Sequence, residues 1–157
     1  MQEPSIPNPA SKPDEATATA PKQPCILVMD DEPEVAQEVA DGLSDEGFDV
    51  QVTGSVDETL AALQRAGGAV QVIVADIRMP GAGGLDLAQM LREPRTGPGA
   101  VEIVLITGHG RQEDREAATA LGALEFIRKP FRLSELIPAV NRALERVQHR
   151  RSASDSP

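Results

Sequence analysis

The feature that most constrains the fold of this chain is a repeated alternation between short apolar runs and segments with helical periodicity. Three runs are almost wholly apolar, CILVM, VQVIVA and VEIVLIT, and two weaker ones, FDVQVT and ALEFI, fit the same rhythm. After each run, apolar residues recur every three or four positions, as in an amphipathic helix. Strand and helix in alternation predict a parallel sheet with helices on both faces. Continuous apolar strands suit such a sheet, because both of its faces are buried.

Helix-terminal signals bound the segments between the runs. Pro33 suits the first turn of a helix, and Gly47 suits the position just after its last turn. Ser55 and Glu58 have the spacing of a capping box, which would open a second helix that Gly67 closes. The remaining helices are expected in GGLDLAQMLRE, RQEDREAATALG and SELIPAVNRALERV. Each apolar run is therefore followed by its own helix.

The 157 residues suit one domain with two unstructured ends. Residues 1–24 are rich in Pro, Ala, Ser and Thr and lack apolar periodicity, which predicts a disordered arm. Residues 25–147 contain all of the periodic segments and form the predicted domain. Residues 148–157 are expected to be a short flexible tail.

Composition argues against several classes of function. The formal net charge is −10, which argues against direct nucleic-acid binding, since that needs a basic face. No apolar run approaches the roughly 20 residues of a membrane helix, and the N-terminus does not resemble a signal peptide. The single cysteine, Cys25, cannot form an intrachain disulfide and is interpreted as a small buried residue rather than a redox thiol. A cytoplasmic location is expected.

Polar residues gather where the predicted strands end. Asp30 and Asp31 follow the first run, Asp76 and Thr107 end the third and fourth strands, and Lys129 follows the fifth. The carboxyl ends of parallel strands meet at one edge of the sheet, which is where open α/β sheets bind ligands. Three carboxylates at close quarters repel one another unless a cation joins them, and Mg²⁺ combines one or two carboxylates with water and phosphate oxygens. The edge therefore predicts a Mg²⁺ site for a phosphorylated species, with a carboxylate as the nucleophile.

The segments around these residues resemble the response-regulator receiver family of two-component systems. The matching stretches are ILVMDD, VIVADIRMPG, LITGHG and FIRKPF, and the resemblance covers about residues 25–147. It implies a flavodoxin-like (βα)5 fold, a doubly wound five-stranded parallel sheet of order 2-1-3-4-5. It also implies that Asp76 is the phosphoacceptor, that Asp31 binds Mg²⁺ directly and Asp30 through water, and that the backbone carbonyl of Arg78 completes the protein ligands.

The resemblance assigns roles to four further residues. Thr107 and Lys129 correspond to the pair that senses the phosphoryl group, and Phe126 corresponds to the switch aromatic. Pro130 corresponds to the family's cis-proline site. Each position also has a structural interpretation, in which Thr107 ends a strand and Phe126 fills the core.

Arg78 and His109 lie at positions that flank the phosphoryl group in this family. Arg78 is two residues beyond Asp76, and His109 is two beyond Thr107. We hypothesise that they hinder the attacking water and slow hydrolysis, and solvated side chains without a kinetic role are an equal alternative. Unchanged dephosphorylation rates in the Arg78→Ala and His109→Ala variants would exclude the kinetic role.

Glu102, in contrast to the acids at the strand ends, is expected to be an ordinary solvated acid.

These features predict a bacterial phosphorelay receiver that catalyses only its own phosphorylation and dephosphorylation. The donor would be a sensor histidine kinase or a phosphotransfer protein. The fourth helix, fifth strand and fifth helix would signal to an unknown protein partner, and homodimerisation through this surface is an open expectation. Alternatives are the receiver piece of a longer multidomain regulator, an unphosphorylated scaffold, and an aspartyl-phosphate hydrolase. The hydrolase alternative is disfavoured by Arg78, because such enzymes generally carry a second acid two residues after the nucleophilic aspartate.

Overall fold

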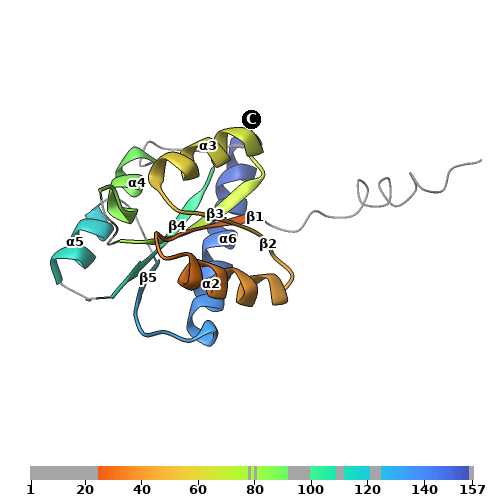
Figure 1. Ribbon diagram of the computed structural model, residues 1–157. Coiled ribbons are helices and arrows are strands. Elements are labelled where there is room, and N and C mark those ends of the chain that lie inside the picture. Colours follow the sequence, from red (N-terminus) through yellow and green to blue (C-terminus); the bar gives the residue numbers. More distant parts are fainter. Residues whose placement is uncertain are drawn as a thin grey trace, which may run out of the picture.

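The computed structural model describes residues 25–77, 79, 81–91, 100–108, 112–120 and 125–155, in which strands and helices alternate (Figure 1). The strands are β1 (Cys25–Met29), β2 (Asp49–Thr53), β3 (Val70–Asp76), β4 (Glu102–Thr107) and β5 (Glu125–Arg128). The helices are α2 (Pro33–Asp45), α3 (Val56–Ala66), α4 (Gly84–Met90), α5 (Gln112–Ala120) and α6 (Leu133–Asp155). The predicted alternation is confirmed. The predicted arm of residues 1–24 lies outside the described residues.

All five strands pair in parallel, in the order β2-β1-β3-β4-β5. This confirms the doubly wound, flavodoxin-like class. The strand order reverses between β1 and β3, so the crevice outside their carboxyl ends is the expected ligand site. Asp30 follows β1 at this point, and Asp76 is the last residue of β3.

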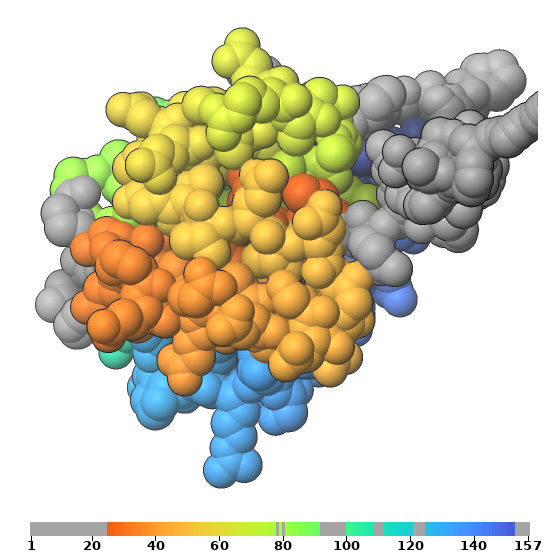
Figure 2. Space-filling view, turned by 45° about the vertical axis from the view of Figure 1, so that its right-hand side comes forward, coloured from red at the N-terminus to blue at the C-terminus, as the bar shows by residue number. Residues whose placement is uncertain are grey.

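The sheet separates two apolar cores. Alternate residues of β1, β3 and β4 pack with α3, α4 and α5 on one face, through residues such as Leu27, Ile73 and Leu105. Their neighbours, such as Ile26, Val74 and Val104, pack with α2 and α6 on the other face. In the space-filling view the blue surface of α6 borders the orange surface of α2 (Figure 2). Both faces of the central strands are buried, which is why their sequences are continuously apolar.

Local signals account for the ends of several helices. The hydroxyl oxygen of Ser55 accepts a hydrogen bond from the backbone N–H of Glu58 at 3.1 Å, which is one of the two bonds of the predicted capping box. The Glu58 carboxylate accepts from the N–H of Gly54 at 2.7 Å instead of from that of Ser55. Gly67 ends α3 in the left-handed conformation, with φ of 58°. Pro33 occupies the first turn of α2.

Helix α6 continues to Asp155, whereas the sequence analysis ended it at Val147 and expected a flexible tail in residues 148–157. Two arginines explain the difference. Arg150 donates to the carbonyl oxygen of Val101 at 2.7 Å. Arg151 donates to the carbonyl oxygens of Ala100 at 2.7 Å and Val70 at 3.0 Å. These bonds hold the last turns of α6 against the amino ends of β3 and β4.

The expectation that Glu102 is solvated is wrong. Glu102 and Glu125 begin β4 and β5 and are each only 7% exposed. Three arginines spaced four residues apart on α6 pair with them in an alternating row, Arg142–Glu125–Arg146–Glu102–Arg150, with closest N···O distances of 2.8 to 3.1 Å. We call this row the arginine ladder. It allows two carboxylates to be buried at the edge of the sheet opposite the predicted site.

Two smaller expectations can be compared with the structure. Cys25 is a buried free cysteine, as interpreted from the sequence, and burial followed by the charge of Asp49 raises the pKa of its thiol. Within the described part of the chain, none of the helices has the length and apolar character needed to cross a membrane.

Candidate functional site

The register of the sheet brings the predicted site residues to one edge. The β1–β3 pairing places Asp30 directly beside Asp76, because the residues before them are partners. The β3–β4 and β4–β5 pairings place Thr107 and Lys129 at nearly the same level on the other side. The backbone N–H of Lys129 also donates to the carbonyl oxygen of Thr107 at 2.7 Å. Four residues that are far apart in the sequence therefore lie together at the carboxyl ends of their strands.

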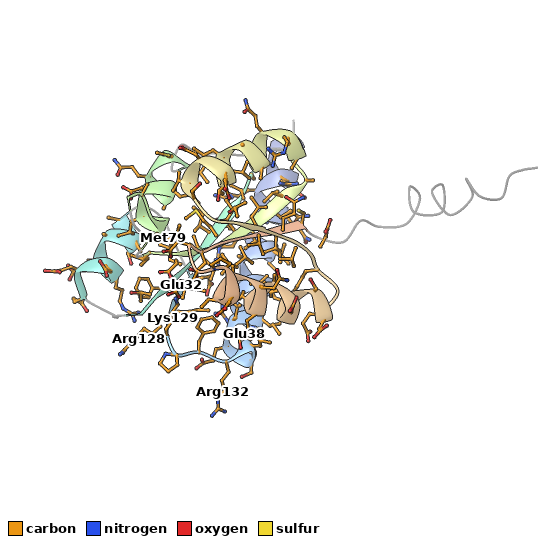
Figure 3. All side chains as sticks on the ribbon, in the orientation of Figure 1. Glu32, Glu38, Met79, Arg128, Lys129 and Arg132 are labelled. Carbon is orange, nitrogen blue, oxygen red and sulfur yellow. The ribbon has the colours of Figure 1, made fainter. Side chains whose placement is uncertain are left out.

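Lys129 lies between the two buried carboxylates. Its ammonium donates to Oδ2 of Asp76 at 2.9 Å and lies 3.8 Å from Oδ2 of Asp30. Figure 3 shows Lys129 with Glu32 and Met79 at this end of the sheet. The peptide bond between Lys129 and Pro130 is cis, as the resemblance implied. The ammonium is thus directed at the acids, and 27% of the Lys129 side chain is exposed at this edge of the sheet.

The electrostatics of the site leave an excess of negative charge. Burial raises the pKa of Asp30, and the charges of Asp76 and Asp31 raise it further, against the opposing effects of the Glu32 N–H and Lys129. Burial acts to lower the pKa of Lys129, but the hydrogen bond and charge of Asp76, with Asp30 and Glu32, outweigh it and raise the pKa overall. One firmly protonated ammonium therefore serves two buried carboxylates.

This donor set fits a hard divalent cation. Two adjacent buried carboxylates with one shared ammonium still attract positive charge, and Asp31 is exposed one residue further along the chain. Across the described residues, no group of three or more His, Cys, Asp and Glu side chains could hold a metal ion by itself, so the three acids are less tightly assembled than expected. Mg²⁺ does not need such a group, because it commonly takes one or two carboxylates and fills its other positions with water and phosphate oxygens.

Thr107 and Phe126 lie on the same face of the sheet. Thr107 is fully buried at the end of β4, and Phe126 is half-buried on β5. Phe126 pairs in register with Leu105, which lies two residues before Thr107 and belongs to the same core. Side chains two residues apart on a strand share a face. The ring and the hydroxyl are therefore diagonal neighbours on adjacent strands.

Two glycines at the start of α4 allow the backbone around Asp76 to be packed closely, a feature the sequence analysis missed. A Cβ on Gly84 would lie 2.9 Å from the carbonyl oxygen of Asp76, and one on Gly83 would clash with the carbonyl oxygen of Ile77. Only glycine permits this approach. The available signal was the Gly-Gly pair itself, which the sequence analysis treated only as the start of a helix.

A groove of about 670 Å³ opens beside the site and was also not predicted. It runs between α2 and the segment that joins β5 to α6, and Lys129 forms part of its wall. Its apolar lining is Val35, Val39, Pro130, Phe131 and Leu133, and its acidic lining is Glu32 and Glu38. The groove connects the surface of α2 with the edge of the sheet that carries the acids. Its residues are spread over two distant segments, so no local pattern revealed it.

Arg78 and His109 lie outside the described residues. The metal-binding role of the Arg78 carbonyl and the kinetic role of both side chains therefore stay predictions.

Comparison with known proteins agrees with this geometry. The sequence model described as the response regulator receiver domain matches residues 26–141. A transcriptional regulatory protein of Pseudomonas aeruginosa, AruR, is 32% identical over 134 residues, which cover 83% of this chain and 53% of that protein. The nitrogen assimilation regulatory protein NtrX of Azorhizobium caulinodans is 36% identical over 132 residues, which cover 83% of this chain and 28% of that protein.

A solved structure gives the same result. The crystal structure of the receiver domain of NtrX from Brucella abortus is similar with a TM-score of 0.68 and 36% sequence identity, covering 76% of this chain and 98% of that one. The chain thus corresponds to the whole of an isolated domain, and it spans about half or less of the two full-length relatives.

Proposed function

This chain belongs to the response regulator receiver domain family, and we propose that it is a phosphorylation-driven switch that accepts a phosphoryl group on Asp76. The observation that carries the proposal is the arrangement of Lys129, whose ammonium lies 2.9 Å from Asp76 and 3.8 Å from Asp30. An acid at the end of a central strand is costly to bury unless a cation serves it. Here two buried carboxylates share one ammonium, that of Lys129, so the site can still attract a second positively charged partner such as a metal ion.

The proposed reaction is a phosphoryl transfer from a phosphohistidine of a sensor kinase or phosphotransfer protein. An oxygen of the Asp76 carboxylate attacks phosphorus, the bond between phosphorus and the donor nitrogen breaks, and the electron pair of that bond stays on the nitrogen. Lys129 would bind an oxygen of the transferred group and keep it oriented. Bound Mg²⁺ would neutralise charge on the phosphoryl oxygens, held by Asp31, Asp76 and the Arg78 carbonyl, with Asp30 acting through water.

We propose that the phosphoryl group is sensed through Thr107 and Phe126. The Thr107 hydroxyl would move toward a phosphoryl oxygen and leave space for the Phe126 ring to turn inward. The surface of α5, β5 and α6, which we call the output face, would then change its affinity for a protein partner or a second copy of the chain. Such a shift requires that the phosphoryl group interact differently with the two states, and its charge-assisted contacts provide that difference.

The groove beside α2 is the proposed approach of the phosphoryl donor. It opens next to Lys129, and its apolar lining would accept an apolar helix face while Glu32 and Glu38 would attract basic side chains at the rim. This assignment predicts that the donor carries basic residues around its phosphohistidine.

We propose receiver function for residues 25–155. AruR carries the description of a transcriptional regulatory protein, and this chain covers 53% of its length, so DNA binding is not proposed for residues 25–155. We propose no catalysis beyond the chain's own phosphorylation and dephosphorylation. A cytoplasmic location follows from the proposed donor and agrees with the buried free Cys25.

The test is incubation with acetyl phosphate and Mg²⁺, followed by intact mass measurement of the wild type and the Asp76→Asn variant. We expect one added phosphoryl group on the wild type, none on the variant, and none on the wild type when EDTA replaces Mg²⁺. Equal modification of both proteins would place the acceptor elsewhere, and no modification of either would contradict the proposal. Asp76-dependent turnover of a generic phosphomonoester would favour the hydrolase alternative.

A further inference from the structure

We propose that Arg115 is a positioning residue of the switch, which holds the Phe126 ring at the exposed rim beside α5 and opposes its turn inward toward Thr107. The inference rests on the proposed receiver function and adds to it a residue that sets how readily the chain is activated. Arg115 lies outside all of the motifs that the sequence analysis singled out.

The contact between Arg115 and Phe126 is a cation–π pair. The guanidinium carbon lies 4.8 Å from the centroid of the ring. This is within the roughly 6 Å over which such pairs attract. Arg115 is exposed and Phe126 is half-buried, so the pair lies at the rim of the core between α5 and β5. Ala118, one turn further along α5, is buried in that core and anchors the helix beside the ring.

The direction of the proposed movement follows from the register of the sheet. Thr107 and Phe126 share one face, and Thr107 lies toward the carboxyl edge. A ring that turns toward Thr107 moves along the strands to the buried site, whereas Arg115 is exposed on the helix. We therefore expect the ring to lose its contact with Arg115 when it fills space near Thr107. The contact is specific to one of the two proposed states, which is the condition for shifting their populations.

The position has a built-in control for charge. Arg128 is two residues after Phe126 on β5, is exposed, and carries the same charge. Its replacement by Gln removes one positive charge from the exposed surface beside the same ring, as Arg115→Gln does, so the pair controls for the change in net charge. A difference between the two variants must then come from the contact with the ring.

The experiment follows Phe126 directly. The chain has three Phe and no Tyr or Trp, so ring-¹³C phenylalanine gives a simple aromatic NMR spectrum, and Phe126→Leu assigns the relevant signals. Beryllofluoride is titrated with Mg²⁺ into the wild type, Arg115→Gln, Arg115→Lys and Arg128→Gln. We expect Arg115→Gln to reach half-saturation at a roughly two- to five-fold lower beryllofluoride concentration, as the strength of exposed cation–π pairs implies. Arg115→Lys should fall between it and the wild type, and Arg128→Gln should leave the midpoint unchanged.

Before beryllofluoride is added, the Phe126 signals of Arg115→Gln should already lie part of the way toward their position in the saturated wild type. An unchanged or higher midpoint for Arg115→Gln, in a wild type that does respond, would overturn the role of Arg115 and leave the proposed function standing. An equal shift for Arg128→Gln would show a general charge effect and would also overturn it. If the wild type responds no more than Asp76→Asn, the proposed function fails, and the role of Arg115 fails with it.

Discussion

Asp30 is the residue at which burial and function are most directly opposed. Its side chain is 7% exposed, it lies beside a second buried acid, and the only cation within ion-pair distance of it in the described residues is Lys129, at 3.8 Å. One stabilising contact is local, since the N–H of Glu32 donates to its Oδ1 at 2.9 Å. A carboxylate in this position does little for the stability of the protein without a bound cation, because its charged form is poorly compensated.

Asp30→Asn is therefore expected to stabilise the Mg²⁺-free protein at neutral pH. Asparagine keeps an oxygen that can accept from Glu32 and removes the charge. The folded-state pKa of Asp30 is raised, so the folded protein binds more protons than the unfolded protein between the two pKa values, and wild-type stability falls as pH rises through that window. The advantage of the variant should thus be full at pH 7 and shrink as pH falls toward about 4, the ordinary aspartate range.

The measurement is urea unfolding in EDTA at several pH values. Asp31→Asn is the matched control, because it removes the neighbouring charge from an exposed side chain and should change stability little. An Asp30→Asn variant less stable than the wild type at pH 7 would contradict the inference that burial and the charge of Asp76 make the Asp30 carboxylate unfavourable. Added Mg²⁺ should reduce the difference in unfolding free energy between Asp30→Asn and the wild type, because a ligand stabilises the protein that binds it.

At the scale of elements, the arginine ladder explains how a helix with a modest apolar stripe is held along its whole length. Glu125 has a lowered pKa: burial acts to raise it, and the hydrogen bonds and charges of Arg142 and Arg146 outweigh burial. Arg146 is the central member, because it contacts both Glu102 and Glu125 at 3.1 Å. Its loss would leave each buried acid with one arginine.

Arg146→Met keeps the apolar stem and removes the fork, and should cost about 1–3 kcal/mol of unfolding free energy at pH 7. The figure is below that of a fully buried pair, since the Arg146 side chain is 27% exposed and both acids keep a partner. Because the pKa of Glu125 is lowered in the folded state, this contribution is present above the ordinary glutamate pKa and is lost as pH falls below about 4.

Denaturant unfolding at pH 7 and at several pH values below about 4 measures the effect. Arg132→Met provides the control, because Arg132 is exposed in the segment before α6 and its backbone N–H, not its side chain, bonds to Glu135. A loss for Arg146→Met no larger than that of the control would show that the ladder contributes nothing net.

Contacts between segments that are distant in the sequence also explain which features of the fold could not be predicted. The strands and helices followed from local periodicity, and Asp30, Asp76, Thr107 and Lys129 followed from the ends of the apolar runs. Glu102 was misjudged because its partners lie more than forty residues away, at Arg146 and Arg150. The extent of α6 was missed for a similar reason, since Arg151 bonds to carbonyl groups of distant strands. Local sequence patterns predict the strands and helices, whereas contacts between distant strands and helices decide which polar residues are buried.

The whole molecule is asymmetric about its sheet. Helix α6 buries Leu136, Ala139, Val140, Ala143, Leu144 and Val147 and is fixed further by the arginine ladder. Helix α5 buries only Asp114 and Ala118 among its residues. The two helices of the output face are thus held with very different strength, although both border β5. Elements with few buried apolar contacts are the ones that move at low cost.

We therefore expect activation to move α5 and β5 while α6 stays in place. On saturation with beryllofluoride and Mg²⁺, amide NMR shifts should be largest near Thr107, through Gln112–Ala120 and Glu125–Arg128, and small for residues 139–147 on α6. Amide hydrogen exchange should change in the same pattern, because local opening of α5 does not require the second core to open. Asp76→Asn treated in the same way separates these changes from non-specific binding. Shifts of equal size along α6 would contradict this expectation and would show that the ion pairs of the arginine ladder rearrange during switching. In that case Arg146→Met should lower the beryllofluoride concentration at half-saturation. If α6 stays in place, Arg146→Met should leave that concentration unchanged.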